Sequence, residues 1–508
     1  MPGYAPQAAR SMFAGFRRAA AELEEWAAGP DSARLDHAGL EKEIMARGRE
    51  LERLLLQAHL DLRAAREERL PQVRAADGSG RPRAEKGRSR QLATVVGPVT
   101  VTRIGYRAPG APIVYPADEQ LSLPAETYSA GLRELMAAEA AGGSFEDAAA
   151  AVFRTTGVRI GKRQAGQLAR RAAADFGSFY AGRRPARAGA GTGDVLVLEA
   201  DGKGIKMLPG SLRPETARNA ARAVPKQDGR LSRGEVRTRK RMAEAGAVFE
   251  ITPVPRTADD ILPVPGAVPG TPAAAQAPQV PDVENKWLTA SVADNAAQVV
   301  AAVFAEADRR DPGRDRTWIA LVDGNKDQIT RIEAEAAARG IEVPVLIDII
   351  HVTEYLWNAT WCFHPEASPD AAPWVREHAR AVLDGRARQV AAAIRAQATA
   401  QDLSRSKRAT AEKAARYLET KAPYLGYPAA LAAGWPISTG VIEGACRHLV
   451  KDRMDITGAR WSTEGAEAIL KLRAIRANND RDHYWDWHLH QEHQRTYRNH
   501  RNCYQLAA

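Results

Sequence analysis

The spacing of hydrophobic residues changes several times along the chain. Over residues 11–70 leucines recur at helical spacing among charged positions, as in ELERLLLQAHLDLRAAREERL, and predict long amphipathic helices. QLATVVGPVTVTRIGYRAP (91–109) instead alternates β-branched and polar residues around Gly97-Pro98, which predicts a β-hairpin. Residues 125–183 return to a helical pattern. The N-terminal third is therefore expected to be mainly helical, with one hairpin.

From residue 194 the pattern becomes that of a mixed sheet. Apolar strands are predicted within 194–204, ending at Asp201, at 247–254 and 286–294, and within 316–329, ending at Asp323. A helix is predicted at 296–310, and 343–360 reads as a buried strand that runs into a helix. Two of these strands end in an aspartate that glycine follows, Asp201-Gly202 and Asp323-Gly324. We therefore expect an α/β core in which two strand ends carry carboxylates.

A chain of 508 residues is expected to form about three or four domains. Two segments read as solvent-exposed and disordered, the Arg-rich 211–241 and the Pro/Ala-rich 253–282, so we expect a disordered insertion over about 211–283. The expected segments are a helical region (1–74), a basic linker and hairpin (75–124), a helical DNA-binding region (125–185), the first part of the core (190–361), an all-helical insertion (362–436) and core helices with a basic tail (437–508).

Charge and cysteine content narrow the class of protein. The formal net charge is +10, which favours a polyanionic partner such as nucleic acid. Three widely spaced cysteines exclude a disulfide framework and a cysteine-rich zinc module. No stretch approaches ~18 uninterrupted apolar residues and the N-terminus has no signal-peptide core, so the expectation is a cytoplasmic protein without a membrane partner.

GSFEDAAAAVFRTTGVRIGKRQAGQLARRAA (143–173) is a candidate DNA-binding element. Ser144 caps a first helix, a turn follows at 156–158, and a second helix begins with Lys162, Arg163 and Gln164. This is the layout of a helix-turn-helix, whose second helix enters a DNA groove. An ordinary helical hairpin has the same pattern, and the sequence alone leaves both open.

Three carboxylates are candidates for metal-dependent phosphodiester chemistry. Such chemistry commonly uses two divalent ions about 3.5–4 Å apart, held by several carboxylates. Asp201 and Asp323 meet at one sheet edge if their strands are adjacent, and Glu443 from a later helix would complete the set. A single strand-end aspartate before glycine is also a common turn cap. Glu199, on the same strand face as Asp201, is the most credible spare ligand.

GVIEGACRHLVKDRMDITGARWS (440–462) places Glu443 before a run of basic residues. In a regular α-helix, Glu443, Arg447 and Lys451 share one face at i, i+4 and i+8. A solvated helix with Glu–Arg pairs explains this spacing as well as a catalytic role does. Whether Glu443 is catalytic therefore depends on whether the carboxylates upstream form a site with it.

The motifs ADGKG, LVDGN, DIIHV and IEGACRHLVKDRM…TGARWS, in this order, resemble those of the retroviral-integrase-like DDE transposases of bacterial insertion sequences, most closely the ISKra4 group. VGPVTVTRIGYR and SFEDAAAAVFRTTG are similar to the N-terminal region of that group. The resemblance covers most of the chain. It implies an RNase H-like α/β catalytic core, a mixed sheet flanked by helices, interrupted by an all-helical insertion.

The resemblance also implies a site and a reaction. Asp201, Asp323 and Glu443 would be the catalytic and metal-binding triad for two Mg²⁺ ions, for which Mn²⁺ can substitute. Asp348 and His351 match an Asp-x-x-His signature, and His351 would contact DNA. Further DNA contacts are expected from the basic residues after Glu443 and from one tryptophan, which could equally be a core residue. These residues are Arg447, Lys451, Arg453, Arg460 and Trp461.

One position departs from the family pattern. Many of these enzymes carry Lys or Arg seven residues after the glutamate, where this chain has Val450. The implied function is DNA cleavage at the ends of an insertion sequence and strand transfer into target DNA. Its partners would be double-stranded DNA, as terminal inverted repeats and target, and further copies of the chain in a dimer or larger oligomer. The alternatives are a metal-dependent DNA nuclease on the same fold and a non-catalytic DNA-binding repressor or domesticated transposase.

Overall fold

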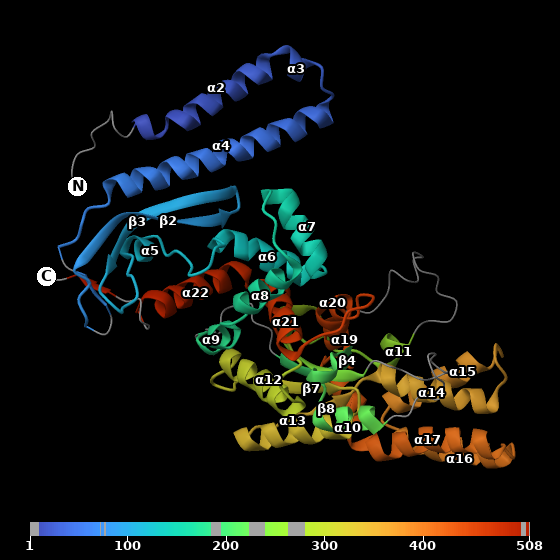
Figure 1. The fold of residues 1–508 in the computed structure, drawn as a ribbon. Helices are drawn as coiled ribbons and strands as arrows, with labels where there is room; N and C mark the ends of the chain where they lie inside the picture. Colours follow the sequence, from blue (N-terminus) through green and yellow to red (C-terminus); the bar gives the residue numbers. More distant parts are fainter. Residues whose placement is uncertain are drawn as a thin grey trace. The chain divides into compact units, whose positions relative to one another are not determined.

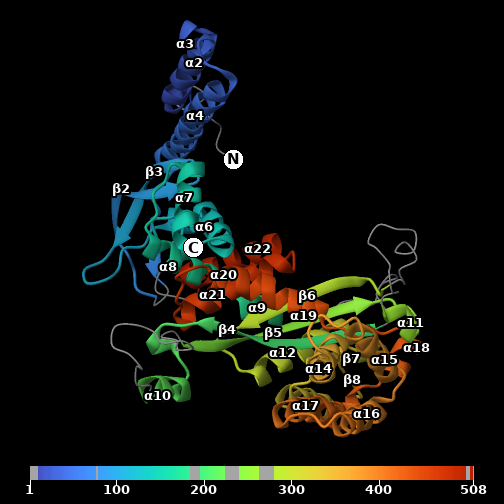
Figure 2. The same cartoon turned by 90° about the vertical axis from the view of Figure 1, so that its right-hand side faces the viewer.

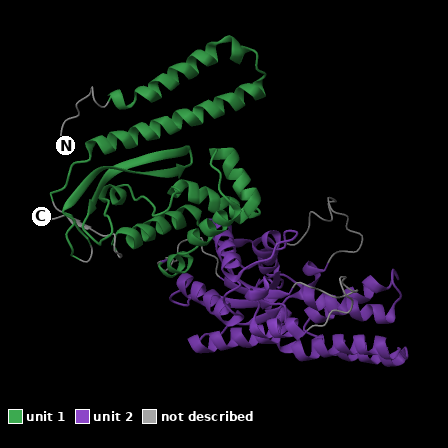
Figure 3. Cartoon of the chain, viewed as in Figure 1, with its two compact units in different colours: residues 1–182, 480–508 green, residues 183–479 purple. Residues whose placement is uncertain are grey.

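The structure is a computed structural model. It describes residues 10–71, 73–75, 78–183, 195–222, 239–262, 280–498 and 504–506. The chain forms two compact units, which Figure 3 colours separately: Met1–Gly182 with Asp480–Ala508, and Arg183–Asn479. The last segment of the chain therefore belongs to the first unit, whereas we expected 437–508 to complete the core.

Contacts that are distant in sequence explain why the C-terminal segment joins the first unit. Strand β9 (Tyr504–Leu506) pairs with β1 (Val73–Ala75), and the Tyr484 hydroxyl of α22 (Arg481–His493) donates a hydrogen bond to the carbonyl of Ala172 at 2.6 Å. A local sequence pattern does not contain this pairing, so the segment boundary could not be read from it.

The first unit combines helices with a long hairpin (Figure 1). Its remaining helices are α2 (Ala14–Ala28), α3 (Pro30–Ala33), α4 (His37–Arg66), α5 (Pro116–Gln120), α6 (Ala130–Gly142), α7 (Phe145–Thr156), α8 (Lys162–Ala172), α9 (Phe176–Ala181) and the π-helical η4 (Gln494–Arg498). The predicted helical patterns over 11–70 and 125–183 are thus confirmed in the described residues.

The predicted hairpin is confirmed and is longer than expected. Strand β2 (Arg83–Thr94) pairs antiparallel with β3 (Gly97–Arg107). The residues before 91 were expected to be a basic linker, and this is wrong from Arg83 onward, where β2 begins. Arg83 to Arg90 look like a polar arm in sequence, but they pair with β3, whose alternate residues are buried. Pairing with a partially buried strand overrides the local polar composition.

The second unit contains a sheet, flanking helices and a helical insertion. Its strands are β4 (Val195–Lys206), β5 (Lys240–Ile251), β6 (Val283–Ser291), β7 (Thr317–Val322) and β8 (Val345–Ile347). Its helices are η1 (Pro209–Ser211), α10 (Pro214–Arg222), α11 (Ala258–Ile261), α12 (Ala296–Arg310), α13 (Lys326–Arg339), α14 (Ile349–Phe363), α15 (Ala371–Leu383), α16 (Ala387–Ala400), α17 (Arg405–Lys421), η2 (Ala422–Tyr424), α18 (Tyr427–Ala432), α19 (Gly440–Ala445), the π-helical η3 (Cys446–Lys451), α20 (Asp452–Met454) and α21 (Thr463–Ala477).

The sheet is mixed, with the strand order β6-β5-β4-β7-β8. Strands β4, β7 and β8 are parallel to one another, and β5 is antiparallel to both of its neighbours. The residues VLVLEA of β4 and WIALV of β7 are buried throughout, as expected of strands that are covered on both faces. The expected α/β core, a mixed sheet flanked by helices, is confirmed.

The alternation of side chains along β4 and β5 assigns the helices to the two faces of this sheet. A Cβ on Gly246 of β5 would meet Val303 of α12 at 2.5 Å, so α12 packs against that face. Glu199 of β4 lies next to the residue that pairs with Gly246, so it points to the opposite face. There it accepts a hydrogen bond from the amide of Ile442 in α19. Helix α19, which carries Glu443, therefore covers the face opposite α12 (Figure 2).

The all-helical insertion predicted for 362–436 is confirmed and consists of α15 to α18. The expectation of a disordered insertion is wrong for the part of 211–283 that the structure describes. Residues 214–222 form helix α10, and Lys240 and Arg241 begin β5, while 223–238 and 263–279 lie outside the described residues. In the described part of the chain, no helix combines the length and the apolarity that crossing a membrane requires.

Candidate metal centre

Three aspartates lie at one edge of the sheet. Asp323 follows the last residue of β7, and Asp348 follows the last residue of β8. Asp201 lies on β4, two residues beyond Glu199, the last residue that pairs with β7. Since the carboxyl ends of parallel strands meet at the same edge, the sheet gathers these carboxylates where ligands bind in α/β folds.

The sequence suggested that Asp201 ends its strand, but β4 continues beyond it. β4 continues to Lys206 because β5 pairs with it along its whole length, and only the β7 side becomes free near Asp201. The carboxylate accepts hydrogen bonds from the amide of Gly202 at 2.6 Å and from the thiol of Cys446 at 3.3 Å. Burial raises the pKa of the Cys446 thiol, and the Asp201 charge adds to the shift, so the thiol remains a donor.

Asp201 and Asp323 line the same pocket, which has a volume of about 420 Å³. Glu244 of β5 and Arg331 of α13 also line this pocket. Burial raises the pKa of Glu244, the Asp201 carboxylate adds to the shift, and Arg213 and Arg331 oppose it. The condition set in the sequence analysis is met, because the strands of Asp201 and Asp323, β4 and β7, are adjacent in the sheet.

The helical insertion closes over the end of β7. Gly324 has φ = 93°, a left-handed conformation that glycine adopts without strain. A Cβ at this position would lie 2.8 Å from the hydroxyl of Tyr417 on α17. Tyr417 stacks on Tyr355 of α14, with ring centroids 3.8 Å apart. The glycine after Asp323 therefore allows the turn at the end of β7 and also leaves room for the insertion to approach closely.

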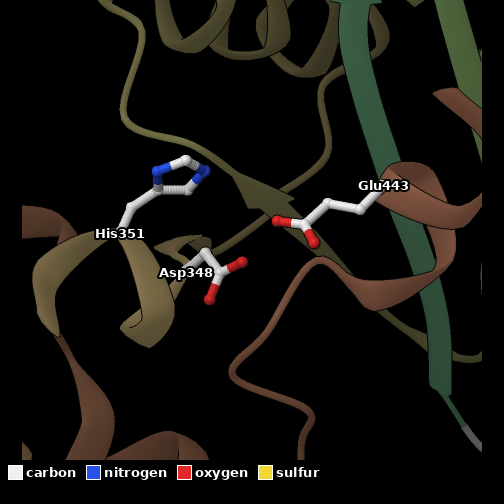
Figure 4. Close-up of side chains that lie close together, drawn as sticks. All are labelled: Asp348, His351 and Glu443. Carbon is white, nitrogen blue, oxygen red and sulfur yellow. The ribbon is translucent and has the colours of Figure 1, made fainter. Parts of the chain in front are cut away.

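Asp348, His351 and Glu443 form a group that can hold a metal ion. One ligand atom from each side chain lies within 4.8 Å of the other two. Glu443 reaches from α19 toward the start of α14, where Asp348 and His351 lie (Figure 4). Asp348 is buried, His351 is partly exposed and Glu443 is exposed, so the group has one side open to solvent. Two carboxylates with one imidazole suit a divalent ion, because oxygen donors bind Mg²⁺ and Mn²⁺ while imidazole suits transition metals.

Hydrogen bonds through Asp348 hold the two halves of this metal group together. Its Oδ1 accepts from the amide of Ile350 at 2.7 Å and caps α14. Its Oδ2 accepts from the amide of Thr439, at 3.0 Å, and from the Thr439 hydroxyl. Thr439 immediately precedes α19, the helix that carries Glu443. Asp348 therefore joins the end of β8 to the helix from which Glu443 projects.

Glu199 lies buried behind the metal group. Its Oε2 accepts the amide hydrogen of Ile442 at 2.7 Å, and its Oε1 has no hydrogen-bond partner among the described residues. Burial raises the pKa of Glu199 far above its ordinary value near 4.5, and the charges of Asp348 and Glu443 add to the shift. A buried carboxyl group in this environment favours the protonated form.

The structure places the predicted triad in two groups near the same edge of the sheet. Asp201 and Asp323 share the pocket, whereas Glu443 lies with Asp348 and His351. The sequence suggested His351 only as a DNA contact, and it did not identify Asp348 as a metal-site residue. The signal was present, because Asp348 follows an apolar strand just as Asp323 does.

The regular-helix interpretation of residues after Glu443 is wrong. Cys446–Lys451 is π-helical, with hydrogen bonds to the fifth residue, so its side chains rotate differently from those of an α-helix. Arg447 and Lys451 are both exposed, but i, i+4, i+8 spacing no longer places them on the Glu443 face. Inserted π-turns recur at functional sites, and this one begins three residues after a metal-group ligand.

The other predicted DNA contacts of this segment differ in exposure. Trp461 is 5% exposed, and its indole N–H donates to the carbonyl of Met454 at 3.1 Å. Arg453 is 2% exposed and lies over the Trp461 ring. Their burial favours the core interpretation of Trp461 and corrects the expectation that Arg453 faces DNA. Arg460 is exposed and stays a candidate.

The helix-turn-helix layout is present in the first unit. Ser144 caps α7, Gly157 ends it in a left-handed conformation, and α8 begins at Lys162. Lys162 and Arg163 are exposed. Gln164 is also exposed, but its Oε1 accepts the amide hydrogen of Gly161, so it caps its own helix. Two helices joined by a short turn are confirmed, whereas the choice between a helix-turn-helix and a helical hairpin, and DNA binding by these residues, stay predictions.

The raised pKa of Glu199 predicts a pH dependence of stability. Above its ordinary value near 4.5 the unfolded chain releases this proton while the folded protein keeps it, so stability falls as pH rises toward the raised pKa. Glu199→Gln removes that loss. In EDTA, we expect its melting temperature to exceed that of the wild type at pH 8 and to match it near pH 4. Exposed Glu342→Gln is the control and should track the wild type; a lower melting temperature of Glu199→Gln at pH 8 would contradict the argument.

Neither a protein-family model nor a curated protein matches this sequence.

Proposed function

We propose that the chain is a DNA transposase that cuts at the ends of an insertion sequence and joins the freed 3′-hydroxyls to target DNA. The observation that carries the proposal is the gathering of acidic residues at one sheet edge. Asp201, Asp323 and Asp348 follow or flank the ends of three parallel strands, and Glu443 reaches the same region from α19. Multiple carboxylates at one point are what metal-dependent phosphodiester chemistry requires.

The strand arrangement supports an RNase H-like core. The five strands follow one another in the chain as β4 to β8 and lie in the order β6-β5-β4-β7-β8, with only β5 reversed. This is the arrangement expected of such a core. The all-helical insertion falls between Asp323 and Glu443, where the resemblance to DDE transposases places it. The motif order in the sequence is a separate support, since it does not depend on the sheet.

The acidic residues have separate roles in this proposal. When bound, two Mg²⁺ ions, or Mn²⁺ in their place, would activate the attacking oxygen and stabilise the leaving one. Asp201 and Asp323 would hold both ions, and Glu443 would hold one. The structure adds Asp348 and His351 as candidate ligands beside Glu443. The chemistry needs no covalent intermediate, so the chain need not provide a nucleophilic side chain.

The charge of the protein supports a nucleic-acid substrate. The net charge of +10 favours binding to DNA phosphates, and Arg447, Lys451 and Arg460 are exposed in the segment that follows Glu443. These cations are the candidates for the DNA contact that Lys or Arg makes at this position in many of the similar enzymes and that Val450 does not provide. Pairing of two element ends would require a dimer or a larger assembly.

The test is a cleavage assay with DNA that carries the sequences flanking the gene. With Mg²⁺ or Mn²⁺, the purified chain should nick at the element termini and then produce joined products, and EDTA should stop both. Hydrolysis with no joined product would favour the nuclease alternative. Specific DNA binding without any cleavage would favour the repressor alternative. Inverted repeats on both sides of the gene would identify the DNA ends to use.

A further inference from the structure

Helix α14 presents an exposed aromatic face. Ile350 is 53% exposed and Trp361 is 38% exposed. Trp357 and Trp361 stack on each other, with ring centroids 5.5 Å apart and planes 30° apart. Residues at i, i+7 and i+11 lie on one side of a helix. We call Ile350, Trp357 and Trp361 the α14 aromatic face.

This face begins beside the metal group. His351, a member of that group, lies on the first turn of α14, next to Ile350. Trp361 lies ten residues further on, a distance of about 15 Å along an α-helix. A DNA strand advances roughly 3.4 Å per stacked nucleotide. A strand with one phosphate at the metal group would therefore reach the tryptophan pair after about four or five nucleotides.

Positive charge borders the same helix. Helix α17 packs along α14, and Lys413 lies over the ring of Tyr355, with its Nζ 5.8 Å from the centroid. Lys407, also exposed, is close enough to Cys362 near the end of α14 to lower the pKa of that thiol against the larger effect of burial. Exposed Glu354 lies on the same side of the helix as the aromatic face, four residues after Ile350, and its carboxylate is 3.4 Å from Nδ1 of His351. The two lysines, both on α17, thus lie along one flank of α14 at two levels, and the carboxylate lies at the metal end.

We infer that the α14 aromatic face stacks unpaired bases of a DNA strand whose backbone passes the metal group. Stacked tryptophans bind any base through its π-face, and neighbouring lysines neutralise the phosphates, which is the combination used for single strands. If the face bound a protein partner, its position next to a metal group would have no explanation, whereas a DNA strand explains both features. The inference rests on the proposed function, and it transfers to Trp357 and Trp361 the stacking role that the buried Trp461 cannot fill.

The test measures DNA binding without metal, so it does not depend on cleavage. Full-length wild type, Trp361→Ala and Trp361→Phe are compared in EDTA by fluorescence anisotropy, on a blunt duplex and on the same duplex with a tail of about six unpaired nucleotides. We expect tailed DNA to bind wild type more tightly than blunt DNA. Trp361→Ala should weaken only tailed binding, by about five- to one-hundred-fold, and Trp361→Phe should restore most of it.

Abasic substitutions locate the stacked base. One abasic site about four or five nucleotides from the duplex junction should weaken wild-type binding and have no further effect on Trp361→Ala, since the two changes remove one interaction. Met45→Ala, which shortens an exposed apolar side chain of the first unit (66% exposed), is the matched control and should bind as wild type.

Three results would overturn the inference. These are equal loss on blunt and tailed DNA, unchanged binding by Trp361→Ala, and a Trp361→Ala variant whose DNA binding is intact but whose molecular mass in solution falls. The last result would show that another copy of the chain covers the face. Thermal melting separates a folding defect from lost stacking, because Trp361→Phe should melt as wild type does. Failure of the cleavage assay with intact tail binding would reject the transposase proposal and leave base stacking in place.

Discussion

Glu443→Gln is expected to lower metal-dependent DNA cleavage by at least about one hundred-fold. Even residues that only orient metal ligands cost 10- to 100-fold in activity or metal affinity, so loss of a ligand itself should exceed this range. Glutamine keeps the size of the side chain and removes the charge that a hard divalent ion requires. Asp201→Asn and Asp323→Asn are expected to have effects of the same size. The measurement is nicking of end-bearing DNA in Mg²⁺ and in Mn²⁺.

The controls for these variants separate chemistry from binding and folding. DNA affinity in EDTA and the melting temperature of Glu443→Gln should be close to wild type, because Glu443 is exposed and its carboxylate forms no hydrogen bond or ion pair with another described residue. Glu342→Gln, an exposed carboxylate outside the site, should retain full activity. If Asp201→Asn or Glu443→Gln also retained full activity, the acidic triad would be wrongly assigned.

Two further variants test whether the Asp348 group contains true ligands. If His351→Gln lowers Mn²⁺ affinity together with activity, the imidazole is a ligand, as the distances in the group allow. Asp348→Asn should lower both the activity and the melting temperature, since the carboxylate also anchors Thr439. A change in melting temperature alone would make Asp348 a structural residue that holds α19 in place.

Arg310→Met is expected to reduce the free energy of unfolding of the second unit by about 3 kcal/mol or more, because removing one member of a buried ion pair typically costs 3–5 kcal/mol. Arg310, Glu250 and Glu306 are at least nine-tenths buried. The guanidinium Nε lies 2.8 Å from Glu306, and Nη1 lies 3.4 Å from Glu250. Arg309 and Arg316 also pair with these carboxylates, so the loss should fall at the lower end of the range.

Urea unfolding followed by circular dichroism measures this change. Arg314→Met is the matched control, because Arg314 forms a more exposed pair with Asp308. Exposed pairs contribute about 1 kcal/mol or less, so the control should lie close to wild type. A loss below about 1 kcal/mol for Arg310→Met would mean that the carboxylates are satisfied without Arg310.

The order of elements around the sheet could be predicted because the signals are local. Apolar runs ending at Asp323 and Ile347 mark buried strands, and a helical period marks 296–310. The ends of individual strands could not be predicted where pairing with a neighbouring strand determines them. Lys203 to Lys206 extend β4, and Arg83 to Arg90 form β2, only because β5 and β3 provide hydrogen-bonding partners.

Sequence by itself determined the kinds of residue available for the site, namely strand-end aspartates and a glutamate in a basic segment. It could not determine which of them meet. Only the tertiary structure decided that Glu443 faces Asp348 and His351, because the Asp348–Thr439 hydrogen bonds join segments about ninety residues apart. Packing likewise buried Trp461 and left Trp361 exposed, since burial depends on neighbours from the whole fold and not on residue type.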